Sequence, residues 1–80
     1  MISSLQIKAA RALLGWSAAQ LSEVSGVGLT TIRRYEMTTG VPKANVGRLL
    51  FLKKSLEQAG IEFTGDPSIN PGVTLHLDKS

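Results

Sequence analysis

Three residues, Gly26-Val27-Gly28, separate two short helical segments, and this link limits most strongly what the chain can fold into. Residues 18–25 before it and residues 29–37 after it both carry apolar residues at helical spacing. Glycine suits the backbone conformations of a tight turn, and the single apolar residue between the glycines can plug the angle. Two short helices joined this closely must cross steeply, as they do in a helix-turn-helix unit.

A first helix is expected near the start of the chain. Ser3 or Ser4 can cap it, because a serine oxygen accepts hydrogen bonds from the free amides of the first turn, and Gly15 can end it. The apolar residues predict its buried face, which comprises Leu5, Ala9, Ala12, Leu13 and Trp16, widened by Ile7, Ala10 and Leu14.

The helices on either side of the turn continue this pattern. Ser17 can cap the second helix, in which Leu21 and Val24 are expected to point inward. The stretch "TTGVPK" ends the third helix, and a fourth should begin near Asn45. The expected packing stripe of this fourth helix is Val46, Leu49, Leu50, Lys53, Leu56 and Ala59, with Phe51 and Leu52 alongside.

After Gly60 the pattern changes to an alternation of apolar and polar residues, which is typical of β-strands. The first segment is "IEFTG", and the second, "GVTLHL", places Val73, Leu75 and Leu77 on one face. Turn-forming residues, "DPSINPG", lie between them. We therefore predict a mainly α fold, with a four-helix bundle and helix-turn-helix in residues 1–60 and a C-terminal β-hairpin in residues 61–80.

Charge is distributed unevenly along the chain. Residues 1–60 carry eight Lys or Arg and three Asp or Glu, whereas residues 61–80 carry one and three. A basic first part favours a polyanion as partner. No segment is apolar for long enough to span a membrane, and the start lacks the pattern of a signal or transit peptide, so we expect a cytoplasmic protein.

The third helix has one face that packing does not explain. Ile32 and Tyr35 define its buried side, and at 100° per residue Thr30, Arg33 and Arg34 fall on the opposite side. Arginine can bond guanine through two hydrogen bonds, and threonine can reach a base or a phosphate. These groups suit the major groove of DNA.

The stretch "RALLGWSAAQLSEVSGVGLTTIRRYE" resembles the lambda-repressor-like (Cro/XRE) helix-turn-helix family, and the resemblance covers about residues 5–59. It implies a compact bundle of four or five helices in a small single-domain transcriptional regulator. It also implies that the residues after the turn enter the major groove. These residues are Gly28, Leu29, Thr30, Arg33 and Arg34.

The same resemblance implies a structural ion pair between Arg11 and Glu36. The chain departs from the family pattern at Ala18, where a glutamine often touches the DNA backbone. Gln20 is a substitute candidate for a phosphate contact. The further candidates for contact with the DNA backbone are Ser17, Lys43 and Arg48.

The ending "LEQAGIEFTGDPSINPGVTLHL" is similar to the tails of small XRE regulators from bacteria and mobile elements. An isolated hairpin is marginally stable in water, so it must pack on the helices or pair with another hairpin. Two protomers could join their hairpins into a four-stranded sheet, which would make the protein a homodimer. The candidate dimerisation residues are Ile61, Phe63, Val73, Leu75 and Leu77.

Other classes of function have little support in the sequence. Cysteine is absent and His76 is the single histidine, which argues against a metal site. Neither a cluster of acidic residues and histidine nor a phosphate-binding loop after a strand is present, so we expect no enzyme and no cofactor.

The function predicted from the sequence is therefore sequence-specific binding of double-stranded DNA. A homodimeric repressor would read a palindromic operator through its third helix. The alternative is a protein-interaction module on the same fold, similar to an antitoxin or an anti-activator, because Ala18 would suit a protein that has lost its DNA contacts and a hairpin edge can capture a strand.

Overall fold

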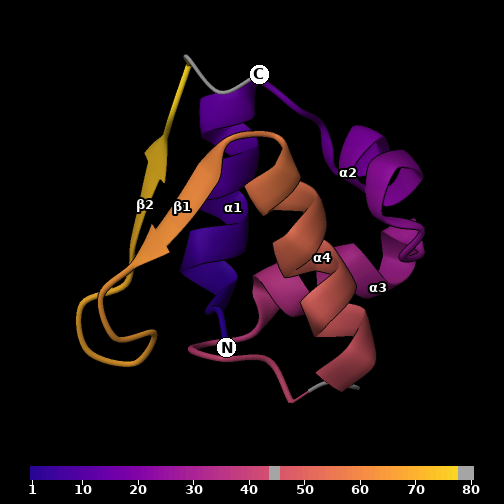
Figure 1. Ribbon diagram of the computed structural model, residues 1–80. Coiled ribbons are helices and arrows are strands. Elements are labelled where there is room, and N and C mark those ends of the chain that lie inside the picture. Colours follow the sequence, from indigo (N-terminus) through magenta and orange to yellow (C-terminus); the bar gives the residue numbers. More distant parts are fainter. Residues whose placement is uncertain (44–45, 78–80) are drawn as a thin grey trace.

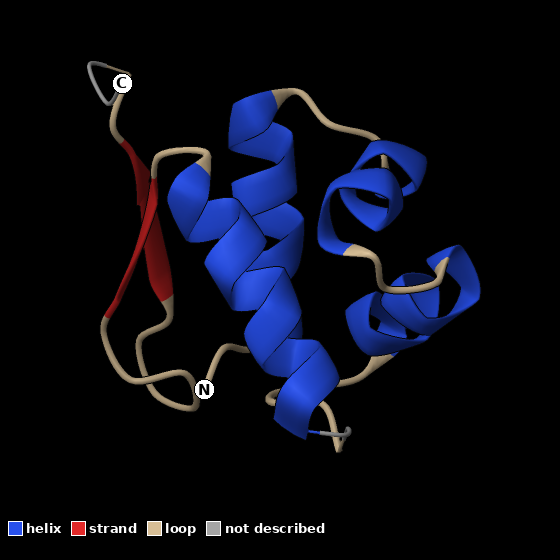
Figure 2. Cartoon of the chain, turned by 45° about the vertical axis from the view of Figure 1, so that its right-hand side comes forward, coloured by secondary structure: helices blue, strands red, loops and turns tan. Residues whose placement is uncertain are grey.

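The computed structural model describes residues 1–43 and 46–77, which form a mainly helical body with a hairpin along one side (Figures 1 and 2). The elements are α1 Ser4–Leu14, α2 Ala18–Ser25, α3 Leu29–Met37, α4 Val46–Gln58, β1 Ile61–Thr64 and β2 Gly72–Leu75. This confirms the predicted fold class of four helices followed by an antiparallel hairpin. The prediction that the fourth helix begins near Asn45 falls outside the described residues.

Serine caps begin the first two helices. Ser3, not Ser4, is the N-cap of α1, and its hydroxyl oxygen accepts from the backbone N–H of Gln6. Ser17 caps α2 in the same way through Gln20. In both cases the glutamine side chain bonds back to the backbone N–H of the serine, which completes a capping box.

One hydrophobic core joins all the helices and the first strand. Its buried aliphatic residues come from all four helices, from β1, from the residue Ile2 before α1 and from the turn residue Val27, and Tyr35 of α3 completes it. These residues are Ile2, Ile7, Ala10, Leu21, Val27, Ile32, Leu49, Leu52, Leu56 and Ile61. Trp16 packs against this core half-buried, as its place on the apolar stripe of the sequence indicated.

The predicted core face of α1 is wrong for four of its residues. Leu5 and Leu13 are 59% and 48% exposed, and both Ala9 and Ala12 are also exposed. The buried side instead carries Gln6, Ile7 and Ala10. Apolar residues occupy so much of the circumference of this helix that their spacing alone could not select the side on which the hairpin packs.

Burial on α2 and α4 also differs from the prediction. Val24 is 54% exposed, and on α4 Val46, Leu50 and Phe51 are exposed. The buried residues of α4 are Leu49, Leu52 and Leu56, which follow one helical stripe. Because four apolar residues stand in a row at positions 49–52, the sequence supports two different stripes, and packing against α2 and β1 selects one of them.

The hairpin lies on α1 and α4 through its apolar face. Ile61 pairs with Leu75 and Phe63 with Val73, so these four side chains share the side that faces the helices. The predicted continuation of the second strand to Leu77 is wrong, because β2 ends at Leu75 and Leu77 is 88% exposed. The ladder ends there because β1 begins at Ile61, and one further hydrogen bond, from the His76 N–H to the Gly60 carbonyl, follows it.

Candidate nucleic-acid interface

Hydrogen bonds fix the turn between α2 and α3. The Ser22 hydroxyl donates to the Val27 carbonyl at 2.7 Å, and the Val27 N–H donates to the Ser25 hydroxyl oxygen at 3.1 Å. The Val27 side chain is buried beneath the turn. The sequence pattern did not predict either serine contact. Their signal is the presence of serine in the last turn of a helix, where side chains readily bond to nearby backbone.

The two sides of α3 differ as the sequence predicted. Ile32 and Tyr35 are buried in the core, whereas Thr30, Arg33 and Arg34 are exposed. Leu29 is half-buried at the first position, and Gly28 is an N-cap that provides no side-chain hydrogen bond. The N-terminal end of α3 thus presents backbone N–H groups next to a hydroxyl and two guanidinium groups.

The two arginines of α3 have different surroundings. The guanidinium carbon of Arg34 lies 5.9 Å from the centre of the Tyr35 ring, within the range of a cation–π contact. For Arg33, no hydrogen bond, ion pair or ring contact of the side chain occurs with any part of the chain that the structure describes. Arg33 is therefore the more available of the two for a ligand.

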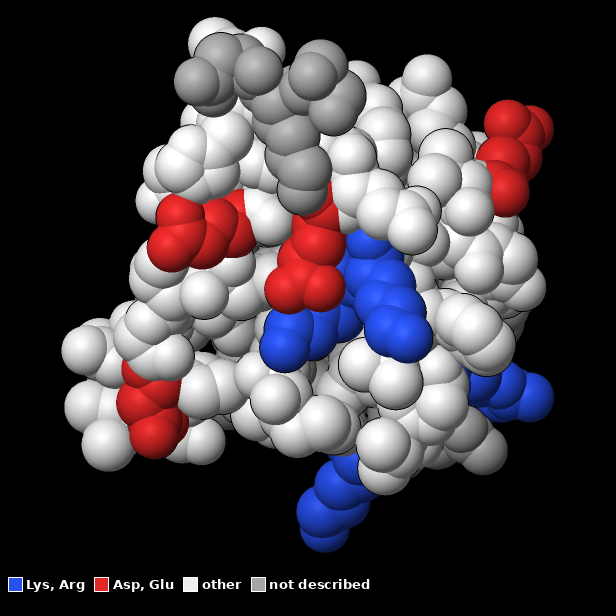
Figure 3. Space-filling model, in the orientation of Figure 1, with Lys and Arg blue, Asp and Glu red and all other residues white. Residues whose placement is uncertain are grey.

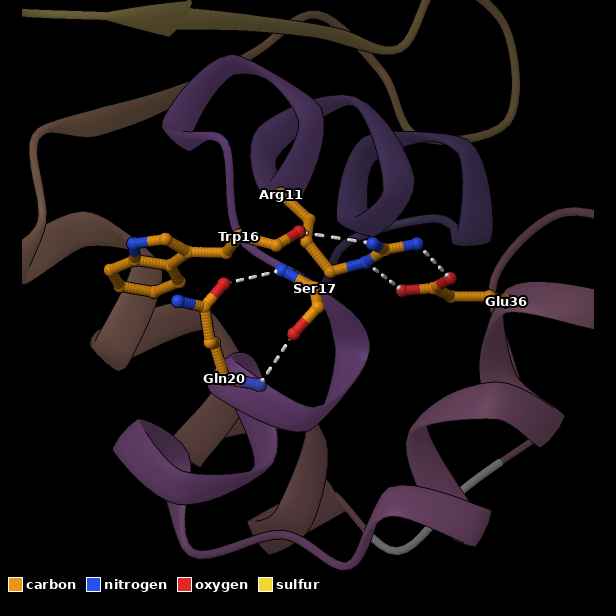
Figure 4. Close-up of polar contacts among 5 residues, drawn as sticks. All are labelled: Arg11, Trp16, Ser17, Gln20 and Glu36. Carbon is orange, nitrogen blue, oxygen red and sulfur yellow. Dashed lines mark hydrogen bonds and ion pairs between the residues drawn. The ribbon is translucent and has the colours of Figure 1, made fainter.

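The N-terminus of α2 retains donors that could reach a ligand. The backbone N–H of Ser17 donates to Gln20 Oε1 at 2.8 Å, and the backbone N–H of Gln20 donates to the Ser17 hydroxyl oxygen at 3.1 Å (Figure 4). The capping box thus uses the acceptor oxygens of both exposed side chains. The Ser17 hydroxyl proton and the Gln20 amide N–H₂ group take no part in it.

An ion pair between Arg11 and Glu36 joins α1 to α3. Arg11 Nη2 lies 2.8 Å from Glu36 Oε1, and Arg11 Nη1 donates to the Trp16 carbonyl at 3.1 Å (Figure 4). The hydrogen bonds to Glu36 raise the pKa of Arg11 above its ordinary value. Arg11 and Glu36 are partly buried and join α1 to α3, so their place in the fold is structural.

The two other basic residues that are candidates for phosphate contacts lie outside the helix-turn-helix formed by α2 and α3. Lys43 is an exposed residue between α3 and α4, and Arg48 is exposed in the first turn of α4. On the face shown in Figure 3, acidic side chains lie over the hairpin, at the centre and at the upper right, and basic ones lie at the centre, the bottom and the lower right. The positive charge of this face therefore lies away from the hairpin.

Residues 1–43 and 46–77 contain no group of three or more His, Cys, Asp or Glu residues that could hold a metal ion. Within those two ranges no helix combines the length and the apolar character that crossing a bilayer requires.

Comparison with known proteins identifies the family. The sequence model of a helix-turn-helix family matches residues 7–49, which is more than half of the chain and includes most of α1, all of α2 and α3, and the start of α4. Comparison with curated proteins gives no match. The matched range contains the turn, the exposed face of α3 and the Arg11–Glu36 pair. The chain therefore belongs to the Cro/C1-type (XRE) helix-turn-helix family of DNA-binding regulators.

Proposed function

We propose that this protein represses transcription by binding a palindromic operator as a homodimer, with α3 of each protomer in the major groove. The observation that carries the proposal is the exposed side of α3, where Thr30, Arg33 and Arg34 stand opposite the buried Ile32 and Tyr35. A helix held in this way presents polar and cationic groups to base edges while its other side stays in the core.

Each exposed group has a defined partner in the proposed complex. Arg33 donates two hydrogen bonds to a guanine, Thr30 bonds a base or a phosphate, and Leu29 contacts a thymine methyl group. The open N-terminus at Gly28 favours a phosphate, because its N–H groups and the helix dipole attract an anion. The proposed phosphate contacts come from Ser17, Gln20, Arg34, Lys43 and Arg48.

The proposed homodimer divides the chain into two parts. Residues 1–60 bind DNA, and residues 61–80 contribute to dimerisation through the hairpin, whose candidate residues are Ile61, Phe63, Val73, Leu75 and Leu77. Two α3 helices separated by one turn of DNA, about 34–36 Å, read the two halves of an inverted repeat. We propose repression because a bound protein can block a promoter simply by occupying it.

Selection of genomic fragments at two salt concentrations tests this function. The purified protein is mixed with fragments that include its own promoter, and the retained DNA is sequenced. We expect one inverted repeat, with affinity falling about 10³-fold or more between 50 and 200 mM salt if six or more phosphates are contacted. Weak retention without sequence preference would refute the proposed operator recognition.

A further inference from the structure

An apolar stripe on α1 is exposed to solvent. Leu5 and Leu13 are 59% and 48% exposed, and the exposed Ala9 and Ala12 lie on the same side of the helix. These are the residues whose spacing predicted burial. The exposed Lys8 borders this stripe on one side, but the stripe itself contains no charged residue. A contiguous exposed apolar stripe is typical of a surface that another protein covers.

One edge of the hairpin is open next to this stripe. In an antiparallel ladder, successive residues point their N–H and C=O groups alternately toward and away from the partner strand. His76 N–H donates to the Gly60 carbonyl at 2.8 Å, so the alternation turns the backbone groups of Val73 and Leu75 away from β1. β2 contains no charged residue, and charged residues are one of the features that prevent an edge strand from pairing.

A cavity of about 240 Å³ joins the stripe to the open strand. It lies between α1 and the start of β2, and most of its lining is apolar. The lining residues are Leu5, Gln6, Ala9, Pro71, Gly72 and Val73. The stripe, the cavity and the strand edge therefore form one continuous surface, which we call the α1–β2 face.

We infer that the α1–β2 face binds a second copy of this chain. The β2 strands pair antiparallel across a two-fold axis into a four-stranded sheet, and the stripes formed by Leu5, Ala9, Ala12 and Leu13 meet beneath it. An edge strand is complementary to its own copy in this orientation, and two uncharged stripes meet without repulsion. This inference rests on the proposed homodimer and assigns its surface, which includes four α1 residues that the sequence placed in the core.

The competing apolar surface on α4 fits a second copy less well. Val46, Leu50 and Phe51 are exposed there, but Lys54 lies on the same side of the helix and is also exposed. A two-fold contact through this side would bring two lysines into the interface, where their like charges would repel. It would also leave the open edge of β2 uncovered.

The α1–β2 face is also compatible with DNA binding. The hairpin lies on one side of the molecule, and α2 and α3 lie on the other (Figures 1 and 2). A dimer formed through β2 and α1 therefore leaves the exposed side of α3 free in both protomers.

Sedimentation of the full chain without DNA tests the inference. The parent protein at about 100 µM should sediment as a dimer, because a micromolar interface is saturated at that concentration. The double variant Leu5→Lys, Leu13→Lys should sediment as a monomer with an unchanged circular dichroism spectrum. Phe51→Lys is the control, since it introduces a lysine at an exposed apolar residue of α4, and it should remain dimeric.

Amide hydrogen exchange gives a second measurement that needs no variant to fold. In the dimer the N–H groups of Val73 and Leu75 should exchange slowly, as does that of Thr74, which points toward β1. In diluted, monomeric protein the exchange of Val73 and Leu75 should become faster while Thr74 stays protected.

A monomeric parent protein, a dimeric double variant, or dissociation by Phe51→Lys alone would overturn the inference. Failure of the proposed function would be recognised separately, because sedimentation without DNA tests only dimerisation and the fragment selection tests operator binding. A parent protein that dimerises through the α1–β2 face but retains no operator would leave the inference standing and refute the function.

Discussion

Arg11 and Glu36, which lie 25 positions apart in the sequence, form a bidentate pair between α1 and the end of α3. Arg11 Nε is 2.9 Å from Glu36 Oε2, and Arg11 Nη2 is 2.8 Å from Oε1. The third nitrogen of the guanidinium donates to the carbonyl of Trp16 in the link before α2. The Arg11 side chain thus links α1, the segment before α2 and the end of α3. These contacts fix the orientation of α3 relative to α1 and α2.

Removal of the carboxylate should destabilise this junction. In Glu36→Ala the partly buried Arg11 loses two charge-assisted hydrogen bonds, and we expect the free energy of unfolding to fall by about 2 kcal/mol. Urea denaturation followed by circular dichroism measures the change. Glu23→Ala removes an exposed carboxylate and serves as control, with an expected effect below about 0.5 kcal/mol. Equal effects of the two variants would show that the pair contributes nothing.

Gln6 should hold the hairpin on α1. Its amide nitrogen donates to the Gly72 carbonyl at 3.0 Å and to the Thr64 carbonyl at 3.3 Å, while its oxygen accepts from the Ser3 N–H. We expect Gln6→Ala to cost about 1–3 kcal/mol, because it leaves buried polar groups without partners. It should also speed amide exchange in both strands.

Nuclear magnetic resonance can follow that exchange residue by residue. Gln58→Ala, which truncates an exposed glutamine near the end of α4, is the matched control and should leave the hairpin amides protected. Unchanged protection in Gln6→Ala would mean that apolar packing alone holds the hairpin.

Two glycines with positive φ should tolerate alanine differently. Gly15 has φ of 71° and no atom within 4 Å of an added Cβ, so Gly15→Ala should cost only the strain of the left-handed conformation, about 1 kcal/mol. At Gly60, with φ of 108°, an added Cβ would lie 2.8 Å from the His76 carbonyl oxygen. Gly60→Ala should therefore lower the thermal midpoint clearly more, and equal midpoints would contradict the described junction of α4 and β1.

The arginines of α3 should contribute unequally to operator binding. We expect Arg33→Ala to weaken binding by about 1–3 kcal/mol and to relax the preference at one base pair. Arg34→Ala should weaken binding of all sequences and reduce the salt dependence, since a side chain held against Tyr35 is placed for a phosphate contact. Fluorescence anisotropy against the selected operator and single-base variants distinguishes these effects.

Lys54→Ala is the control for loss of one positive charge, because Lys54 is exposed on α4 and lies outside both the helix-turn-helix and the α1–β2 face. A loss of base preference in Arg34→Ala, and not in Arg33→Ala, would reverse the assigned roles. Operator binding that survives both arginine substitutions would refute docking of α3 in the major groove.

The sequence predicted those parts of the fold that local chemistry decides. Capping serines and helix-ending glycines located α1 and α2, and the three-residue link located the turn. The buried side of α3 was also predicted correctly, because Ile32 and Tyr35 are its two large apolar residues on one stripe. In this helix the apolar pattern offers no second choice.

The prediction failed where the pattern allowed two choices. α1 and α4 carry apolar residues around much of their circumference, so the buried side depends on which elements pack against them. The role of Gln6 was missed for a related reason, since its partners Thr64 and Gly72 lie about sixty residues away. Contacts at such separation leave no periodic signal in the sequence.

The hydrogen-bonded turn at Val27 has a consequence for the energetics of association. Because Ser22 and Ser25 bond its backbone and its side chain is buried, α2 and α3 hold their mutual angle in the unbound protein. The complex then forms without the entropic penalty of ordering this segment, so preorganisation raises the affinity without any additional contact. Substitutions at Ser22 or Ser25 should thus weaken DNA binding although neither residue contacts DNA, because they make the turn between α2 and α3 less rigid.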